Sequence, residues 1–156
     1  FGQSFQITPL QMLRAASAII NGGNLVTPHF AVKSVSEADG TAVEFNYEIQ
    51  SNAIEEKTSL MMKDILRQVV EEGGGKKAYL EGFSIGGKTA TSQKLPRGSG
   101  KYISSFIGFS PVDNAKVIAM CLIDEPQGIY YGGTIAAPVI RELFENILPY
   151  LEIQNN

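Results

Sequence analysis

The chain has 156 residues, of which 44% are hydrophobic and 19% are charged, and its formal net charge is −3. These values are ordinary for a globular chain about one domain long. They give no basic surface for nucleic acid or an anionic membrane, and no apolar stretch approaches the roughly 18 residues that a membrane-spanning helix needs. The single cysteine, Cys121, excludes an internal disulfide.

The N-terminal part predicts one helix followed by an irregular segment. Thr8-Pro9 is a typical helix start, because a hydroxyl can cap the first turn and proline suits the first helical position. Apolar residues at helical spacing continue to Ile20, after which a glycine pair ends the helix. Residues 24–52 are rich in turn-forming residues, with short strands expected near Phe30–Val35 and Ala42–Phe45.

A second helix and three strands are predicted next along the chain. Apolar residues recur at helical spacing over about residues 55–72, and the glycine triplet 73–75 ends that helix. Three β-like runs separated by turn clusters follow: Phe83–Gln93, Ser104–Ser110 and Lys116–Asp124. Because their connections are short, we expect these strands to form an antiparallel meander.

The last element is the most regular helix of the sequence. An apolar stripe runs from Ala136 to Leu148, and we expect the helix to begin near Thr134 and to end at Pro149. Such a stripe must cover an apolar surface, and the predicted meander provides one. The predicted fold class is therefore α+β, an antiparallel β-sheet with flanking helices.

One segment of the sequence fits a nucleotide-binding pattern. Gly82 followed by Gly87-Lys88-Thr89 matches the spacing of a phosphate-binding loop. That loop requires an apolar strand before it and a helix after it. Residues 76–81 make a poor buried strand, and Pro96 and nearby glycines leave no room for a following helix. The nucleotide-binding interpretation is therefore the weaker one.

The alternative interpretation makes the same segment a β-strand. Side chains alternate along a strand, so Lys88 and Ala90 face one side while Thr89 and Thr91 face the other. A strand with a cation and two hydroxyls can bind an extended peptide and its carboxylate, and its free backbone N–H groups can contribute to an oxyanion hole. A solvated edge strand protected by a lysine is the other hypothesis for these residues.

Lys88-Thr89-Ala90 resembles the lysine–threonine–glycine motif of the serine penicillin-recognising enzymes. Further segments are similar, in the same order, to class B penicillin-binding proteins of the division and sporulation type: Phe1-Gly2-Gln3 with Thr8–Gln11, Ser105–Pro111, Ile123–Pro126 and Tyr130–Pro138. The chain begins without methionine, and we expect it to be part of a longer protein. The resemblance implies that residues 1–156 form the C-terminal portion of a single transpeptidase domain with the penicillin-binding, β-lactamase-like fold.

The resemblance also implies an activity and a set of site residues. The parent would be a serine D,D-transpeptidase that cross-links peptidoglycan stem peptides ending in D-Ala-D-Ala and binds β-lactam antibiotics. Lys88 would assist proton transfer, Thr89 and Thr91 would hold the substrate carboxylate, and the Thr91 backbone N–H would be one oxyanion donor. Ala90 stands where the motif has glycine, which narrows the approach to the site. A degenerate, non-catalytic module that keeps the fold is the alternative.

The same resemblance leads to expectations about location and partners. We expect no cofactor, metal or nucleic acid, an extracytoplasmic position on a membrane-anchored parent, and division or sporulation proteins as further partners. No serine of the chain is followed by lysine three residues later, so the chain lacks the family's nucleophile motif and should be inactive alone. The turn Tyr130–Gly133 could line the edge of a cleft, but packing on the sheet as an aromatic turn is the expected role.

Overall fold

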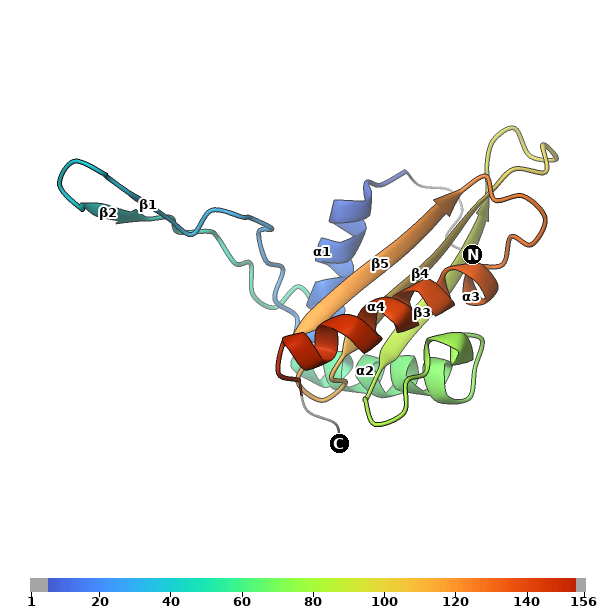
Figure 1. The fold of residues 1–156 in the computed structure, drawn as a ribbon. Coiled ribbons are helices and arrows are strands. Elements are labelled where there is room, and N and C mark those ends of the chain that lie inside the picture. Colours follow the sequence, from blue (N-terminus) through green and yellow to red (C-terminus); the bar gives the residue numbers. More distant parts are fainter. Residues whose placement is uncertain (1–5, 154–156) are drawn as a thin grey trace.

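A three-stranded antiparallel sheet with helices on both faces forms the body of the molecule (Figure 1). The computed structural model describes residues 6–153, so the similarity noted at Phe1-Gly2-Gln3 lies outside the described residues. The strands are β3 Gly86–Gln93, β4 Tyr102–Ser110 and β5 Val117–Asp124. Their order in the sheet is β3-β4-β5, which confirms the predicted meander and the α+β class.

The strand register explains why the phosphate-loop interpretation is wrong. Thr89 lies inside β3, opposite Phe106 of β4, and no helix begins there. The strand starts at Gly86 rather than at the predicted Phe83. The reason is a tight turn at Gly82, whose φ is +82°, in which the Phe83 N–H donates to the Leu80 carbonyl at 3.2 Å.

The helices follow their local sequence signals closely. They are α1 Pro9–Ile20, α2 Glu56–Glu71, α3 Gly132–Ile135 and α4 Ala137–Tyr150, with a 3₁₀ turn η1 at Lys76–Ala78. Thr8 caps α1 by accepting from the Gln11 N–H at 3.2 Å, while the Gln11 side chain accepts from the Thr8 N–H at 3.0 Å. Pro149 does not end α4 as predicted, since the last turn continues to Tyr150.

Each face of the sheet carries its own apolar core. On the α4 side, Phe106, Ile140 and Phe144 are fully buried in the larger cluster. On the opposite side, Phe109 packs with Ile20 of α1 and with the partly buried Leu66 of α2. The predicted stripe of the last helix therefore covers the meander as expected. None of the helices within residues 6–153 has the length and hydrophobicity needed to cross a membrane.

Residues 24–52 form an extension away from this body (Figure 1). Short strands β1 Lys33–Val35 and β2 Ala42–Glu44 pair antiparallel within it, near the predicted positions, and every residue of both is exposed. The sheet, its edge strand β3 and the connection from β5 to α4 are the parts that build the site.

Candidate functional site

The candidate site lies along β3, which is an edge strand. Within residues 6–153, β3 pairs only with β4, so its other edge has no partner strand. Thr89 and Thr91 face α3 and α4, whereas Lys88 lies on the face covered by α1 and α2. The prediction that these side chains alternate is confirmed. The Lys88 ammonium folds back to the strand edge and donates to the Thr89 carbonyl at 2.7 Å.

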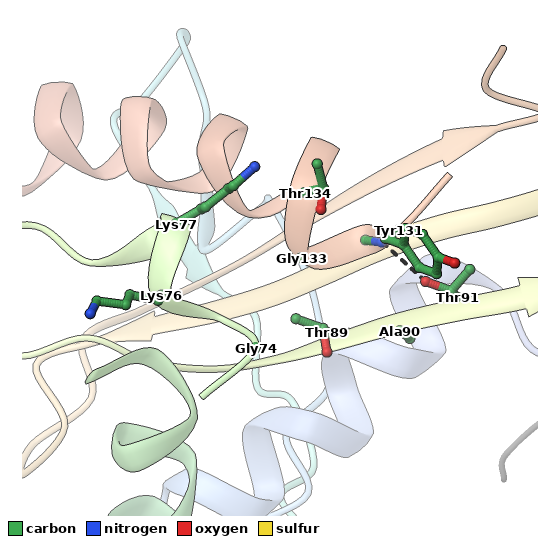
Figure 2. Close-up of a pocket in the computed structure, with 10 residues that line it drawn as sticks. Gly74, Lys76, Lys77, Thr89, Ala90, Thr91, Tyr131, Gly133 and Thr134 are labelled. Atoms are coloured by element: carbon green, nitrogen blue, oxygen red, sulfur yellow. Dashed lines mark hydrogen bonds between the residues drawn. The ribbon is translucent and has the colours of Figure 1, made fainter. Parts of the chain in front are cut away.

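A pocket of about 440 Å³ lies against this edge, between β3, the glycine turn after α2, and the segment that begins α3 (Figure 2). Its lining residues are Gly74, Lys76, Lys77, Thr89, Ala90, Thr91 and Tyr131 to Thr134. Both threonines of the predicted site contribute to it, and Lys88 does not. Residues with hydroxyl groups and residues with ammonium groups therefore line one open cavity, a combination that suits an anionic group.

The Thr91 hydroxyl has a defined orientation in this pocket. The Gly132 N–H donates to Thr91 Oγ1 at 3.0 Å, a hydrogen bond drawn in Figure 2. A hydroxyl carries one donor and two acceptor positions, so this contact uses an acceptor position and leaves the proton free. Thr91 can therefore donate to a ligand while it is held from behind by the backbone of α3.

Buried contacts fix the segment that carries Gly132. The Ser104 hydroxyl, which is fully buried beside Thr91 on β4, donates to the Tyr130 carbonyl. The Tyr130 ring stacks on Tyr102 with centroids 3.9 Å apart. A Cβ atom on Gly132 would lie 2.3 Å from the Ala90 carbonyl oxygen, so only glycine allows this close approach to the sheet.

Gly133 meets the same restriction on the other wall of the pocket. A Cβ atom there would lie 2.3 Å from the Gly74 carbonyl oxygen. Tyr131 is 58% exposed at the mouth of the pocket, and the neighbouring Tyr130 hydroxyl raises the pKa of Tyr131 above its usual value. The predicted role of this turn, packing on the sheet, is therefore right for Tyr130 and wrong for Tyr131, which lines the cavity.

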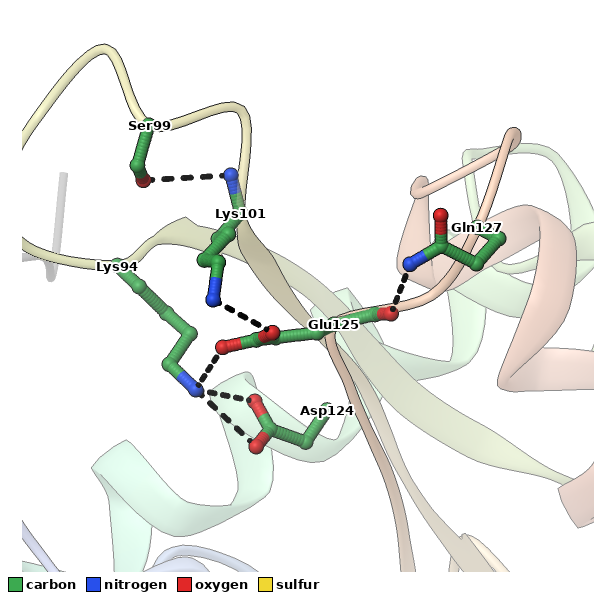
Figure 3. A network of polar contacts seen from close by, with 6 residues as sticks. All are labelled: Lys94, Ser99, Lys101, Asp124, Glu125 and Gln127. Atoms are coloured by element: carbon green, nitrogen blue, oxygen red, sulfur yellow. Dashed lines mark hydrogen bonds and ion pairs between the residues drawn. The ribbon is translucent and has the colours of Figure 1, made fainter.

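An ion-pair network links the end of β3 and the start of β4 to the end of β5 (Figure 3). Lys94, just after β3, contacts Asp124 at 3.0 Å and Glu125 at 2.8 Å, while Lys101 contacts Glu125 at 3.0 Å. Contact with Glu125 and then Asp124 raises the pKa of Lys94, and the two lysines lower the pKa of Glu125. The network joins the β3–β4 turn to the end of β5, where the connection to Tyr130 begins.

Several pocket residues were not foreseen in the sequence. The sequence pattern places Lys76 and Lys77 only in a poor strand, and Gly74 only in a helix stop. Gly132 and Gly133 carried a usable signal, because a glycine pair directly before a helix often marks a close backbone approach. The partners of this approach include Ala90 and Thr91 for Gly132 and Gly74 for Gly133, which lie 41 to 59 residues earlier in the chain, and nothing local in the sequence identifies them.

Comparison with known proteins identifies the family to which this site belongs. Residues 1–145 match the penicillin binding protein transpeptidase domain. The chain belongs to the penicillin-binding protein transpeptidase family. It is 38% identical to stage V sporulation protein D of Bacillus subtilis over 99% of this chain, and 32% identical to the probable peptidoglycan D,D-transpeptidase PenA of Neisseria meningitidis over 98%.

Solved structures of penicillin-binding proteins have the same fold. Penicillin binding protein 3 of Mycobacterium tuberculosis, complexed with ampicillin, has a TM-score of 0.85 and 25% identity over 99% of this chain and 37% of that one. The transpeptidase domain of Burkholderia pseudomallei penicillin-binding protein 3 has a TM-score of 0.75 and 26% identity, covering 96% of this chain and 44% of that one. The chain spans 25% of the length of each of the two curated relatives above. The family expected from the motif resemblance is confirmed.

Proposed function

We propose that residues 1–156 are the C-terminal portion of a D,D-transpeptidase domain whose nucleophilic serine lies elsewhere in the full-length protein. The observation that carries this proposal is the arrangement on β3. Two threonine hydroxyls line a pocket at an open strand edge, and Thr91 is oriented by the Gly132 N–H at 3.0 Å. In this role, Thr89 and Thr91 bind the terminal carboxylate of a stem peptide or of a β-lactam.

The backbone of β3 supports a further role for Thr91. The Thr89 carbonyl accepts from the Lys88 ammonium, as expected for a carbonyl that points to the free edge of the strand. In an antiparallel strand, the N–H and C=O of one residue point to the same side, as do those of the residue two positions on. The Thr91 N–H then points to the free edge, where it acts as an oxyanion donor to the scissile carbonyl.

Lys88 and Ala90 act from the other face of the strand. The Lys88 ammonium reaches the free edge, where it stabilises the proton-transfer network around the nucleophile of the full-length protein. Ala90, which replaces the motif's glycine, adds a methyl group on this face. We infer a catalytic parent rather than a degenerate module because both hydroxyls and the lysine of the motif are present.

The proposed substrate and location follow from this activity. The substrate is a peptidoglycan stem peptide ending in D-Ala-D-Ala, and β-lactams acylate the same serine. Cross-linking takes place outside the cell membrane, so the full-length protein acts at its extracytoplasmic face. The relative from Bacillus subtilis is named for sporulation, which supports sporulation proteins as partners, and division proteins are the alternative partners.

Labelling with a fluorescent penicillin tests the proposal. We expect the full-length protein to form a denaturation-resistant adduct and the 156-residue chain to form none, because no serine in it has lysine three positions later. Lys88→Ala in the full-length protein should slow acylation by about 2–4 kcal/mol of activation free energy, with Lys116→Ala as the control. Stoichiometric labelling of the chain alone would place the nucleophile within it, and an unlabelled full-length protein would favour the non-catalytic module.

A further inference from the structure

A second groove continues directly from the candidate site. Its volume is about 500 Å³, and it is lined by Lys76, Lys77, Tyr79, Glu81, Pro138 and Arg141. Lys76 and Lys77 also line the threonine pocket, so the two cavities meet at η1. Figure 2 shows the two lysines on the opposite side of the threonine pocket from Tyr131. A ligand held by the threonines can therefore extend across η1 towards α4.

This second groove is cationic, although the chain as a whole is acidic. Three of its residues carry positive charge and only Glu81 carries negative charge. Elsewhere Arg67, Lys94 and Lys101 are neutralised by ion pairs with acidic side chains. Within residues 6–153, no ion pair involves the three cations of the groove, which are Lys76, Lys77 and Arg141. Their charges remain available to an anionic ligand.

The proposed reaction determines where such a ligand would come from. In acylation, the serine oxygen bonds to the carbonyl carbon, the C–N bond breaks, and the serine proton passes to the departing D-Ala amine. In transfer, an acceptor amine bonds to the same carbon, the C–O bond breaks, and a proton from the amine returns to the serine. Because the second half-reaction is the reverse of the first in form, the acceptor amine enters by the position that the leaving amine vacates.

That position lies beside the carboxylate-binding threonines. An acceptor placed there fills the threonine pocket with its amine-bearing end, and the rest of the molecule must continue into an adjoining space. The cationic groove adjoins this pocket through Lys76 and Lys77. Its charge selects an acceptor with carboxylates, and its partly exposed Tyr79 gives the peptide an aromatic surface.

We propose that the groove between η1 and α4 binds the acyl acceptor, an amine-bearing peptide with free carboxylates, through Lys76, Lys77 and Arg141. This inference rests on the proposed transpeptidase function. Glu81 opposes such a ligand by charge repulsion, so removing its charge should improve acceptor binding while removing the charge of Arg141 should weaken it.

Partitioning of the acyl-enzyme tests the inference in the full-length protein. The enzyme is acylated by a synthetic donor ending in D-Ala-D-Ala, and the ratio of transfer to hydrolysis is measured at low acceptor concentration. Because both products come from the same acyl-enzyme, this ratio does not depend on the acylation rate. The acceptors are a short peptide with one amine and two free carboxylates, and the same peptide with both carboxylates amidated.

Charge variants should change the ratio in opposite directions. We expect Arg141→Gln and Lys77→Gln each to lower the ratio about two- to fivefold with the carboxylate acceptor, and Glu81→Gln to raise it by a similar factor. With the amidated acceptor the three variants should match the parent, and Lys116→Gln, a control away from the groove, should match it with both acceptors. Added salt should reduce the differences between variants.

Two results would overturn the inference while leaving the proposed function intact. One is a ratio unaffected by Arg141→Gln, Lys77→Gln and Glu81→Gln although the acyl-enzyme forms. The other is an equal loss with both acceptors, which would mean that the groove does not recognise carboxylates. Failure of the parent to form an acyl-enzyme, which is seen before any acceptor is added, would refute the proposed function and the inference with it.

Discussion

Removal of the Ser104 hydroxyl separates a positioning role from a purely structural one. Ser104 is fully buried and donates to the Tyr130 carbonyl, which holds the segment whose Gly132 N–H orients Thr91. We expect Ser104→Ala in the full-length protein to slow acylation by penicillin. The chain offers a matched control on the same strand, because Ser110 is equally buried and its hydroxyl donates to the Ser84 carbonyl at 3.0 Å.

The hydrogen bonds that each variant loses set the expected change in its free energy of unfolding and in its acylation rate. Each loses one buried hydroxyl–carbonyl hydrogen bond and leaves the carbonyl without that partner, which costs about 1–2 kcal/mol of the free energy of unfolding. Ser104→Ala should also loosen Thr91, and the hydrogen bond proposed from Thr91 to a carboxylate would be worth about 1.5–3 kcal/mol. Loss of half the upper value, about 1.5 kcal/mol, corresponds to roughly tenfold slower acylation. Ser110→Ala should show only the loss of stability.

Two measurements are needed, a denaturant titration and the second-order rate constant for acylation. A double variant adds a further condition, since Thr91→Val removes the hydroxyl that Ser104 positions. In that background, Ser104→Ala should not slow acylation further, because residues that act through one contact are not additive. Equal slowing by Ser104→Ala and Ser110→Ala would reduce Ser104 to a structural residue. Additive slowing in the Thr91→Val background would mean that its effect does not pass through Thr91.

Three further variants probe the pocket and its surroundings. Gly133→Ala should lower the free energy of unfolding by about 1–3 kcal/mol in a denaturant titration, because its Cβ would lie 2.3 Å from the Gly74 carbonyl oxygen; Gly74→Ala, with no atom near its Cβ, should not. Ala90→Gly should leave acylation unchanged or accelerate it with bulky penicillins, and a large loss of rate would show that the methyl group has a role. Hydrogen bonds from Lys94 and Lys101 hold the pKa of Glu125 below its usual value. This carboxylate therefore stabilises the fold above about pH 4.3, and the stabilisation is lost as the pH falls through the lower pKa of the folded state. Glu125→Gln should therefore lower the melting temperature at pH 7 and not at pH 2, and an equal shift at both would refute the electrostatic explanation.

The fold could be predicted from the sequence wherever a short segment determines its own structure. The start of α1 follows from Thr8 and Gln11, which cap the helix within one turn. The meander follows from short connections, which allow only antiparallel pairing. The start of β3 was misjudged because the turn at Gly82 depends on a left-handed backbone conformation that the apolar pattern around Phe83 does not reveal. Pro149 was misjudged because a proline removes one N–H but does not prevent the final turn of a helix from closing.

For a similar reason, only the β3 part of the candidate site could be predicted from the sequence. The motif residues share one strand, so alternation alone separates Lys88 from Thr89 and Thr91. The remaining walls come from η1 and from the start of α3, which meet β3 only in the folded chain. The family resemblance pointed to the strand and to the activity proposed for it, but the two cavities that meet at Lys76 and Lys77 required the tertiary structure.

The same geometry explains how the site accommodates Ala90 in place of glycine. On the face of β3 that carries Thr91, Gly132 packs so closely that its own Cβ would lie 2.3 Å from the Ala90 carbonyl oxygen. The Ala90 side chain lies on the other face, with Lys88, where it is exposed. Its methyl group therefore leaves the contact between α3 and Thr91 intact. The Ala90 methyl group hinders only a ligand that approaches from the Lys88 side. This steric hindrance should increase with the size of the ligand's group on that side.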